Sequence, residues 1–185
     1  ENEKILYVMD PVKANKPWTK SLKYAGLTFN ENQDFTIVEI DLQYGKSSVR
    51  NVNAPTASNK TNLQTEAFRR LNKVFFYGKF SFDYMNRLKM GWCNVINPYR
   101  SPIFFADSMP GRQTMETYIL EGGIGYMIGK HWSIGAKIDY LTASNAKKKD
   151  ARNKNTYMNL KVYPGVVYRS KYLNLGLNFI YQKET

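Results

Sequence analysis

The clearest pattern along the chain is a period of two between Tyr118 and Tyr140, where nearly every second residue is apolar or aromatic. Successive side chains of a β-strand point to opposite faces of a sheet, so this period indicates strands. The short segment Gly129-Lys130-His131 interrupts it, and we therefore predict a hairpin of two long strands. One face of the hairpin is apolar with aromatic residues near both ends, whereas the other is polar and rich in glycine.

The same alternation recurs on both sides of this hairpin. We predict seven strands, at residues 36–44, 63–71, 74–84 with a weaker continuation to 92, 114–128, 132–140, 157–168 and 173–181. The strand at 63–71 is the least regular, because Phe68 and Arg70 fit neither face well. A two-residue turn at Asn72-Lys73 would place Glu66 opposite Lys79. Pro164 lies on an apolar face and predicts a bulge, since proline cannot donate to the ladder.

Long polar connections at 46–62, 87–113 and 142–155 alternate with short turns, so the turns lie on one side of the sheet and the loops on the other. This asymmetry is typical of outer-membrane barrels, which have short periplasmic turns and long external loops. We therefore predict an all-β fold, an antiparallel up-and-down transmembrane β-barrel, over residues 35–185.

The number of predicted strands bears on whether these residues complete the barrel. Seven strands are an odd number, whereas bacterial single-chain barrels close with an even one. We therefore expect residues 35–185 to be the N-terminal part of a larger barrel, or an eighth strand to lie within residues 1–32. Residues 1–34 as a whole are predicted to form a plug segment that folds against or inside the barrel.

The formal net charge of +12 and the 15% aromatic content raise the question of nucleic-acid binding. The densest basic run is Lys147-Lys148-Lys149, and no aromatic residues are interleaved with it as stacking platforms. We therefore expect no nucleic-acid partner. Instead, these lysines and the apolar pair Phe104-Phe105 are predicted to be contact residues in external loops.

Candidate chemistry is limited by the inventory of side chains. The chain has one histidine, His131, in a predicted turn, and one cysteine, Cys93, so an internal disulfide and a cysteine-based zinc site are excluded. Acidic pairs on the polar faces lack a histidine partner for a catalytic triad. We predict no catalytic residue, metal site or cofactor, and interpret the charged inner positions as lumen lining, namely Glu39, Asp41, Lys79, Asp83, Glu121, Lys137, Asp139 and Lys161.

Several short motifs occur in a fixed order: Tyr77-Gly78-Lys79, Trp92-Cys93-Asn94, Asn97-Pro98-Tyr99, Asp107-Ser108, and Glu116-Thr117-Tyr118 before Gly122-Gly123. In this order the chain resembles, over about residues 35–181, the uncharacterised outer-membrane β-barrel proteins of Bacteroidetes grouped as the DUF6850-like family. The resemblance implies a bacterial outer-membrane location and much longer chains. It supplies no catalytic or binding residues.

Three functions are compatible with these expectations. The first is a non-enzymatic outer-membrane barrel that serves as a channel or transporter of small polar solutes. The second is a structural or interaction subunit of a larger outer-membrane complex, whose partners would be other outer-membrane proteins, membrane lipid and lipopolysaccharide. The third is a soluble β-rich module that binds anionic ligands.

Overall fold

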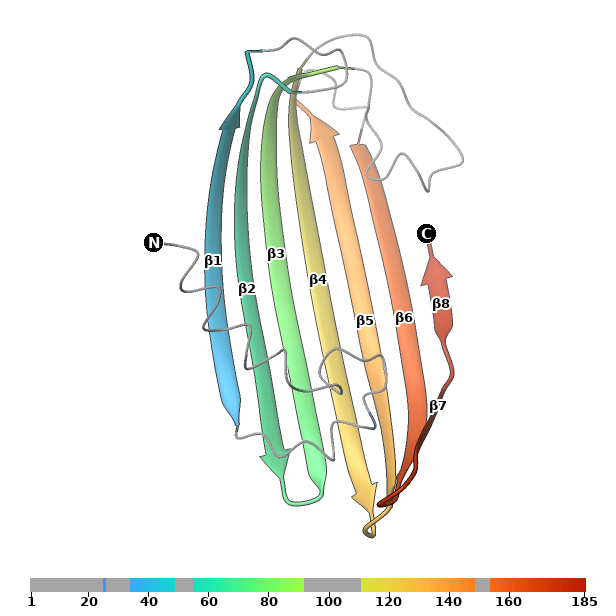
Figure 1. The fold of residues 1–185 in the computed structure, drawn as a ribbon. Helices are drawn as coiled ribbons and strands as arrows, with labels where there is room; N and C mark the ends of the chain where they lie inside the picture. The colour runs from blue at the N-terminus through green and yellow to red at the C-terminus, as the bar shows by residue number, and fades with distance from the viewer. Residues whose placement is uncertain (1–24, 26–33, 49–54, 92–110, 149–153) are drawn as a thin grey trace.

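The described part of the chain is a single antiparallel sheet (Figure 1). The structure, a computed structural model, describes residues 25, 34–48, 55–91, 111–148 and 154–185. The strands are β1 (Phe35–Lys46), β2 (Ala57–Leu71), β3 (Val74–Met90), β4 (Gly111–Ile128), β5 (Trp132–Lys147), β6 (Lys154–Arg169), β7 (Asn174–Asn178) and β8 (Tyr181–Glu184). Strands β1 to β7 follow one another in the sheet, and β8 pairs with β6. The predicted all-β, antiparallel, up-and-down arrangement is therefore confirmed.

The predicted hairpins at Asn72-Lys73 and at Gly129-Lys130-His131 are both present, and the first has the expected register. Across the turn at Asn72-Lys73, Glu66 lies opposite Lys79, and Asn72 adopts a φ of 52°. Such a left-handed backbone is better tolerated by asparagine than by most residues. In the β4–β5 hairpin Glu121 lies opposite Asp139.

Several strands extend further than the sequence predicted. Strand β2 begins at Ala57, β4 at Gly111 and β6 at Lys154, and β5 ends at Lys147. Much of the predicted polar loops 46–62 and 142–155 therefore belongs to the sheet. Residues 57–62 and 142–147 are polar or small on both faces. Because alternation of apolar and polar residues is lost there, the period that reveals a strand is also lost.

Pro164 does not produce the predicted bulge, since the register between β5 and β6 runs without a shift and places Pro164 opposite Ala136. Along an antiparallel strand, the backbone groups of alternate residues point to opposite neighbours. The backbone groups of Pro164 point toward the last strand. There the N–H of Phe179 donates a hydrogen bond of 2.9 Å to the carbonyl oxygen of Pro164. Proline has no N–H with which to donate a second hydrogen bond to Phe179. The predicted last strand is divided at this point into β7 and β8.

A register shift occurs instead between β3 and β4, between Arg87 and Met90. Lys89 has a φ of 53° at this point. A bulge bends its strand and increases the local twist. The shift lies at the loop end of β3, away from the turns.

The two faces of the sheet differ in polarity. We call the face that carries Glu121 and Lys137 the inner face, and the face that carries Leu120 and Ile138 the outer face. Large apolar side chains on the outer face are exposed along β1–β5 and β7, including Val38, Ile40, Leu63, Phe76, Leu120, Ile124, Ile134, Ile138, Leu175 and Leu177. The inner face carries most of the buried residues, including Phe68, Phe75, Ser133, Lys137, Ala143, Asn159 and Val167.

An apolar cluster lies on the inner face near the turns. Phe68 and Phe75 are buried there, and Phe35 and Tyr77 pack against them. The guanidinium carbon of Arg70 lies 4.8 Å from the centre of the Phe75 ring. Phe68 and Arg70 thus have definite places, although neither fits the alternation of β2 by itself.

Strands β1 and β7–β8 form the two edges of the sheet (Figure 1). Within the described residues each edge has a strand on one side only, so the sheet is not closed into a barrel. The predicted eighth strand within 1–32 and the predicted plug segment 1–34 lie outside the described residues, except at Ala25 and Asp34. No helix in the part that the structure describes is long and apolar enough to cross a membrane.

Candidate functional site: the inner face of the sheet

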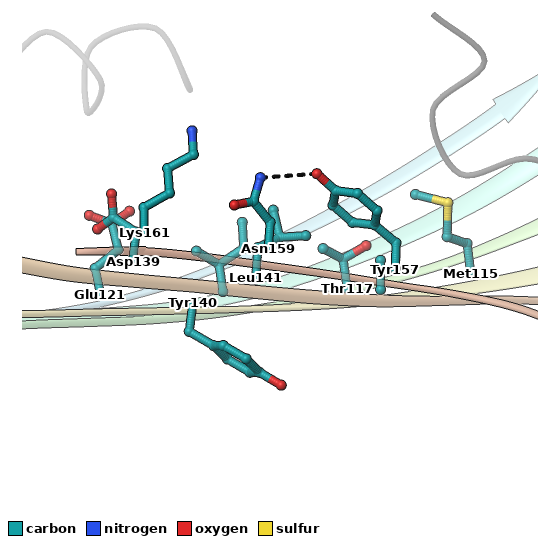
Figure 2. A pocket seen from close by; sticks show the side chains of 11 residues that line it. Met115, Thr117, Glu121, Asp139, Tyr140, Leu141, Tyr157, Asn159 and Lys161 are labelled. Atoms are coloured by element: carbon teal, nitrogen blue, oxygen red, sulfur yellow. Dashed lines mark hydrogen bonds between the residues drawn. The ribbon is translucent and has the colours of Figure 1, made fainter. Parts of the chain in front are cut away.

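A row of charged residues crosses the inner face. The strand registers align Glu66, Lys79, Glu121, Asp139 and Lys161 on five neighbouring strands, β2 to β6. Figure 2 shows that Glu121, Asp139 and Lys161 point to one side of the sheet and Tyr140 to the other. The predicted period of two therefore brings together, on one face, charges that are far apart in the sequence.

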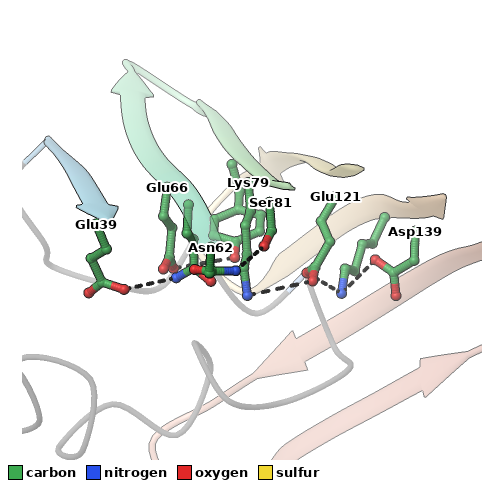
Figure 3. A network of polar contacts seen from close by, with 10 residues as sticks. Glu39, Asn62, Glu66, Lys79, Ser81, Glu121 and Asp139 are labelled. Carbon is green, nitrogen blue, oxygen red and sulfur yellow. Dashed lines mark hydrogen bonds and ion pairs between the residues drawn. The ribbon is translucent and has the colours of Figure 1, made fainter. Parts of the chain in front are cut away.

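Lys137 links the two carboxylates of this row. Its Nζ lies 2.9 Å from Oε2 of Glu121 and 2.6 Å from Oδ1 of Asp139. On the other side of Glu121, Nζ of Lys79 lies 3.9 Å from Oε1 (Figure 3). Lys137 is only 6% exposed. A buried ammonium group is tolerated because the two carboxylates compensate its charge.

A second polar group joins β2 and β3. The amide of Asn62 donates to Oδ1 of Asp83 at 2.8 Å and to the hydroxyl of Ser81 at 3.2 Å. Lys60 forms an ion pair of 3.2 Å with the same Asp83 oxygen. Figure 3 shows Asn62 and Ser81 on the same side of the sheet as the charged row. On β2 and β3, therefore, these inner-face polar side chains pair with one another.

All the predicted lumen-lining residues lie on the inner face, as the strand registers require. Lys79, Glu121, Lys137 and Asp139 form one connected group, and Asp83 pairs with Lys60. Glu39 accepts a hydrogen bond of 3.2 Å from Gln64, and Asp41 one of 2.7 Å from Gln43. Lys161 belongs to the charged row but forms no ion pair within the described residues.

Sequence reasoning missed Lys60 and Asn62 as inner-face residues, and it missed the burial of Asn159. Lys60 and Asn62 lay in a segment predicted to be a loop, where no alternation marked the strand. Asn159 was assigned to the polar face of its strand, but nothing in the sequence indicated that it is 7% exposed.

A groove of about 460 Å³ runs along the inner face over β4, β5 and β6. Glu121, Asp139 and Lys161 line its charged end, and Ile119, Leu141, Tyr157 and Asn159 are among the residues farther along it. The side-chain nitrogen of Asn159 donates to the Tyr157 hydroxyl at 3.0 Å (Figure 2). The groove therefore combines a charged end with apolar side chains and neutral hydrogen-bonding groups.

The predicted loop-contact residues have different outcomes. Lys147 was predicted to lie in an external loop, and this is wrong, because it is the last residue of β5 and is 3% exposed on the inner face. Strand β5 continues further than its polar sequence suggested, which carries Lys147 into the sheet. Lys148 follows the strand and is exposed. Phe104, Phe105 and Lys149 lie outside the described residues.

His131 lies in the turn between β4 and β5, as the sequence predicted. Its Nδ1 is 2.9 Å from the carbonyl oxygen of Arg169, the last residue of β6. Within the described ranges, no three histidine, cysteine or acidic side chains are grouped so that they could hold a metal ion.

Comparison with known proteins identifies a family. No curated protein and no solved structure matches the chain. A family profile matches residues 24–185, which include every strand of the sheet. The chain therefore belongs to DUF6850, a family of unknown function.

Proposed function

We propose that this sheet is part of the wall of a bacterial outer-membrane β-barrel, and that the barrel is a channel for small polar solutes. The observation that carries the proposal is the opposition of the two faces. The outer face exposes apolar side chains across most of the sheet, and the inner face is lined by polar side chains. An apolar outer face of this size is unfavourable in water but favourable in contact with lipid.

The outer face has the features of a lipid-facing surface. Ile40 on β1 is 69% exposed, Leu120 on β4 is 52% exposed and Leu177 on β7 is 58% exposed. Aromatic pairs flank this apolar region. Phe82 and Tyr118 have ring centres 4.9 Å apart toward the loops, and Trp132 and Tyr168 have the same separation at the turns. Aromatic residues at the two borders of an apolar band are typical of membrane interfaces.

Strand length also supports a membrane-spanning sheet. Strands β2 to β6 contain between 15 and 18 residues. A tilted strand needs about 9–11 residues to cross the hydrocarbon core. Each of these strands is long enough to cross it and to extend beyond it.

The open edges indicate how the barrel would be completed. The backbone groups on the free sides of β1 and of β7–β8 would need hydrogen-bond partners in lipid, where water cannot supply them. We infer that further strands pair with these edges, either from a longer chain of this protein or from another protein. Most of the inner charges compensate one another in ion pairs, so the lumen would be lined mainly by neutralised polar groups, which suit small polar solutes.

An alternative is a structural or interaction subunit with a filled interior. The observation that favours it is the filling of the inner face near the turns, where Phe68 and Phe75 are 3% and 1% exposed and Ala25 is 1% exposed. In this alternative the loops would bind lipopolysaccharide or other outer-membrane proteins. A soluble β-rich module is disfavoured by the exposed apolar face.

Two measurements test these proposals. The protein, expressed in full in a Gram-negative host, should fractionate with outer membranes and should migrate faster on a gel before heating than after it. Recovery as a soluble protein without detergent and without a heat-dependent shift contradicts the membrane proposal. Stepwise conductance in planar bilayers supports the channel, whereas a folded, inserted protein without conductance supports the subunit.

A further inference from the structure

The groove on β4, β5 and β6 contains a buried acceptor without a donor. Asn159 is 7% exposed, and its side-chain nitrogen is engaged with the Tyr157 hydroxyl. Its Oδ1 is buried and accepts no hydrogen bond from the described part of the chain. In Figure 2 this oxygen points away from Tyr157, toward the end of the groove at Asp139 and Lys161. A buried oxygen without a donor is costly, so a ligand hydroxyl at this position would be stabilised.

The same groove contains an uncompensated cation. Glu121 and Asp139 are engaged with the ammonium groups of Lys79 and Lys137 at distances between 2.6 and 3.9 Å. Lys161 is a third cation beside these two carboxylates, and it forms no ion pair within the described residues. Figure 2 shows its Nζ extending away from the sheet. At the charged end of the groove, Lys161 is thus an ammonium group without a carboxylate partner in the described ranges, and it can pair with one negative charge on a ligand.

The two groups are arranged to contact one ligand. Asn159 and Lys161 are two positions apart on β6, so their backbones are separated by roughly 7 Å on the same face. Ile119 and Leu141 lie in register with Asn159 on β4 and β5 and offer apolar contact to the carbon atoms of a ring. The separation of roughly 7 Å between Asn159 and Lys161 is comparable to the size of a six-membered sugar acid.

We propose that the groove binds a small hydroxylated carboxylate. The carboxylate of the ligand accepts hydrogen bonds from Lys161 Nζ, a ligand hydroxyl donates to Asn159 Oδ1, and the ring contacts Ile119 and Leu141. This inference rests on the proposed function, because it places the groove in the lumen of the barrel. It also specifies the chemical class of the solute.

The probes for the test are D-glucuronate and D-glucose, which share a ring and most hydroxyl groups but differ in the carboxylate. Binding is measured by isothermal titration calorimetry with the full protein in detergent micelles. A charge-assisted hydrogen bond should make glucuronate bind about tenfold more tightly than glucose. Lys161→Gln should remove this preference and leave glucose binding unchanged. Asn159→Leu should weaken the binding of both probes.

Lys60→Gln is the matched control, because Lys60 is also an inner-face lysine but pairs with Asp83 outside the groove. It should leave both affinities unchanged. Far-UV circular dichroism checks that each variant is folded. If Asn159→Leu does not fold, Lys161→Gln decides the test alone, since Lys161 is partly exposed and forms no ion pair in the described ranges.

Equal affinity for the two probes, no binding of either, or an unchanged preference in Lys161→Gln would overturn this inference. The result is separable from the membrane test. An inserted, heat-modifiable protein that binds neither probe contradicts only the groove assignment. A protein that is soluble without detergent contradicts the membrane proposal, even if its groove prefers glucuronate.

Discussion

The hydroxyl group of Ser133 donates a hydrogen bond of 2.7 Å to the carbonyl oxygen of Ala25, although 108 positions separate the two residues. Ser133 is fully buried and Ala25 is 1% exposed. Ala25 precedes all eight strands, so this contact brings a part of the chain before β1 onto the inner face of β5. Apart from Ala25 and Asp34, the predicted plug segment lies outside the described residues, and it stays a prediction.

The contact at Ala25 depends on the absence of a side chain at Gly135. A methyl group there would lie 2.9 Å from the Cα of Ala25 and 2.9 Å from the carbonyl oxygen of Ile124. We expect Gly135→Ala to lower the free energy of unfolding by about 1–3 kcal/mol, because both neighbours are backbone atoms. Urea unfolding in detergent micelles, followed by tryptophan fluorescence, measures the change.

Gly122→Ala is the control for this substitution, since a methyl group at Gly122 meets no atom within 4 Å. It should change the free energy of unfolding by less than about 0.5 kcal/mol. Equal effects of the two substitutions would show that the close approach of Ala25 does not contribute to stability.

Lys137 should be the most sensitive charged residue of the inner face. Lys137→Met leaves Glu121 and Asp139, whose side chains are 20% and 24% exposed, without their shared cation. We expect a loss of about 3 kcal/mol, since breaking a buried ion pair leaves an uncompensated charge. The triple variant Lys137→Met, Glu121→Gln and Asp139→Asn should recover most of the lost free energy of unfolding, because it removes the two carboxylate charges together with their shared cation. Urea unfolding at neutral pH compares the two.

The ion pair of Lys60 with Asp83 provides the comparison, because the Lys60 side chain is 33% exposed. Lys60→Met should cost less than about 1 kcal/mol, as is usual for an ion pair that water can reach. A loss at Lys60 as large as that at Lys137 would mean that burial does not distinguish the two sites.

Two isoleucines test whether lipid covers the outer face. Ile138 and Ile128 are both 47% exposed, but Ile138 lies in the middle of the β4–β5 hairpin and Ile128 is adjacent to its turn. In lipid vesicles, Ile138→Arg should lower the free energy of unfolding by about 2–4 kcal/mol and Ile128→Arg by about 0–1 kcal/mol. Unfolding by urea from vesicles gives both values. Similar small effects at the two positions are expected for a surface in water and would contradict the membrane proposal.

Pro164→Val should join β7 and β8 into one strand. The substitution supplies an N–H opposite Phe179, whose own N–H already donates to residue 164 at 2.9 Å. We expect one additional hydrogen bond and a gain of about 0.5–1.5 kcal/mol. Amide hydrogen exchange should show protection of the new N–H. Exchange as fast as in an exposed loop would indicate that the proline is not the cause of the interruption.

The hairpins could be predicted because their signals are local. A turn of few residues fixes the register of the strands beside it, so the pairs Glu66 with Lys79 and Glu121 with Asp139 follow from counting positions. The composition of the inner face follows from the same period of two.

Other features depend on contacts that a period cannot show. The start of β2 was missed because residues 57–62 are polar on both faces, and the burial of Lys147 was missed because β5 continues through a polar segment. For Pro164, the sequence indicates the face of its side chain but not the strand toward which its missing N–H points. The pairing of Ser133 with Ala25 involves two small residues that carry no pattern.

The order of the strands has a consequence for how the protein folds. Apart from β8, which returns to β6, each strand pairs with the strands immediately before and after it in the chain. Paired strands are therefore close together in the sequence for a β protein. Such local pairing favours rapid folding of the sheet. The sheet can grow by one strand at a time along a single advancing edge, while β1 remains at the opposite edge.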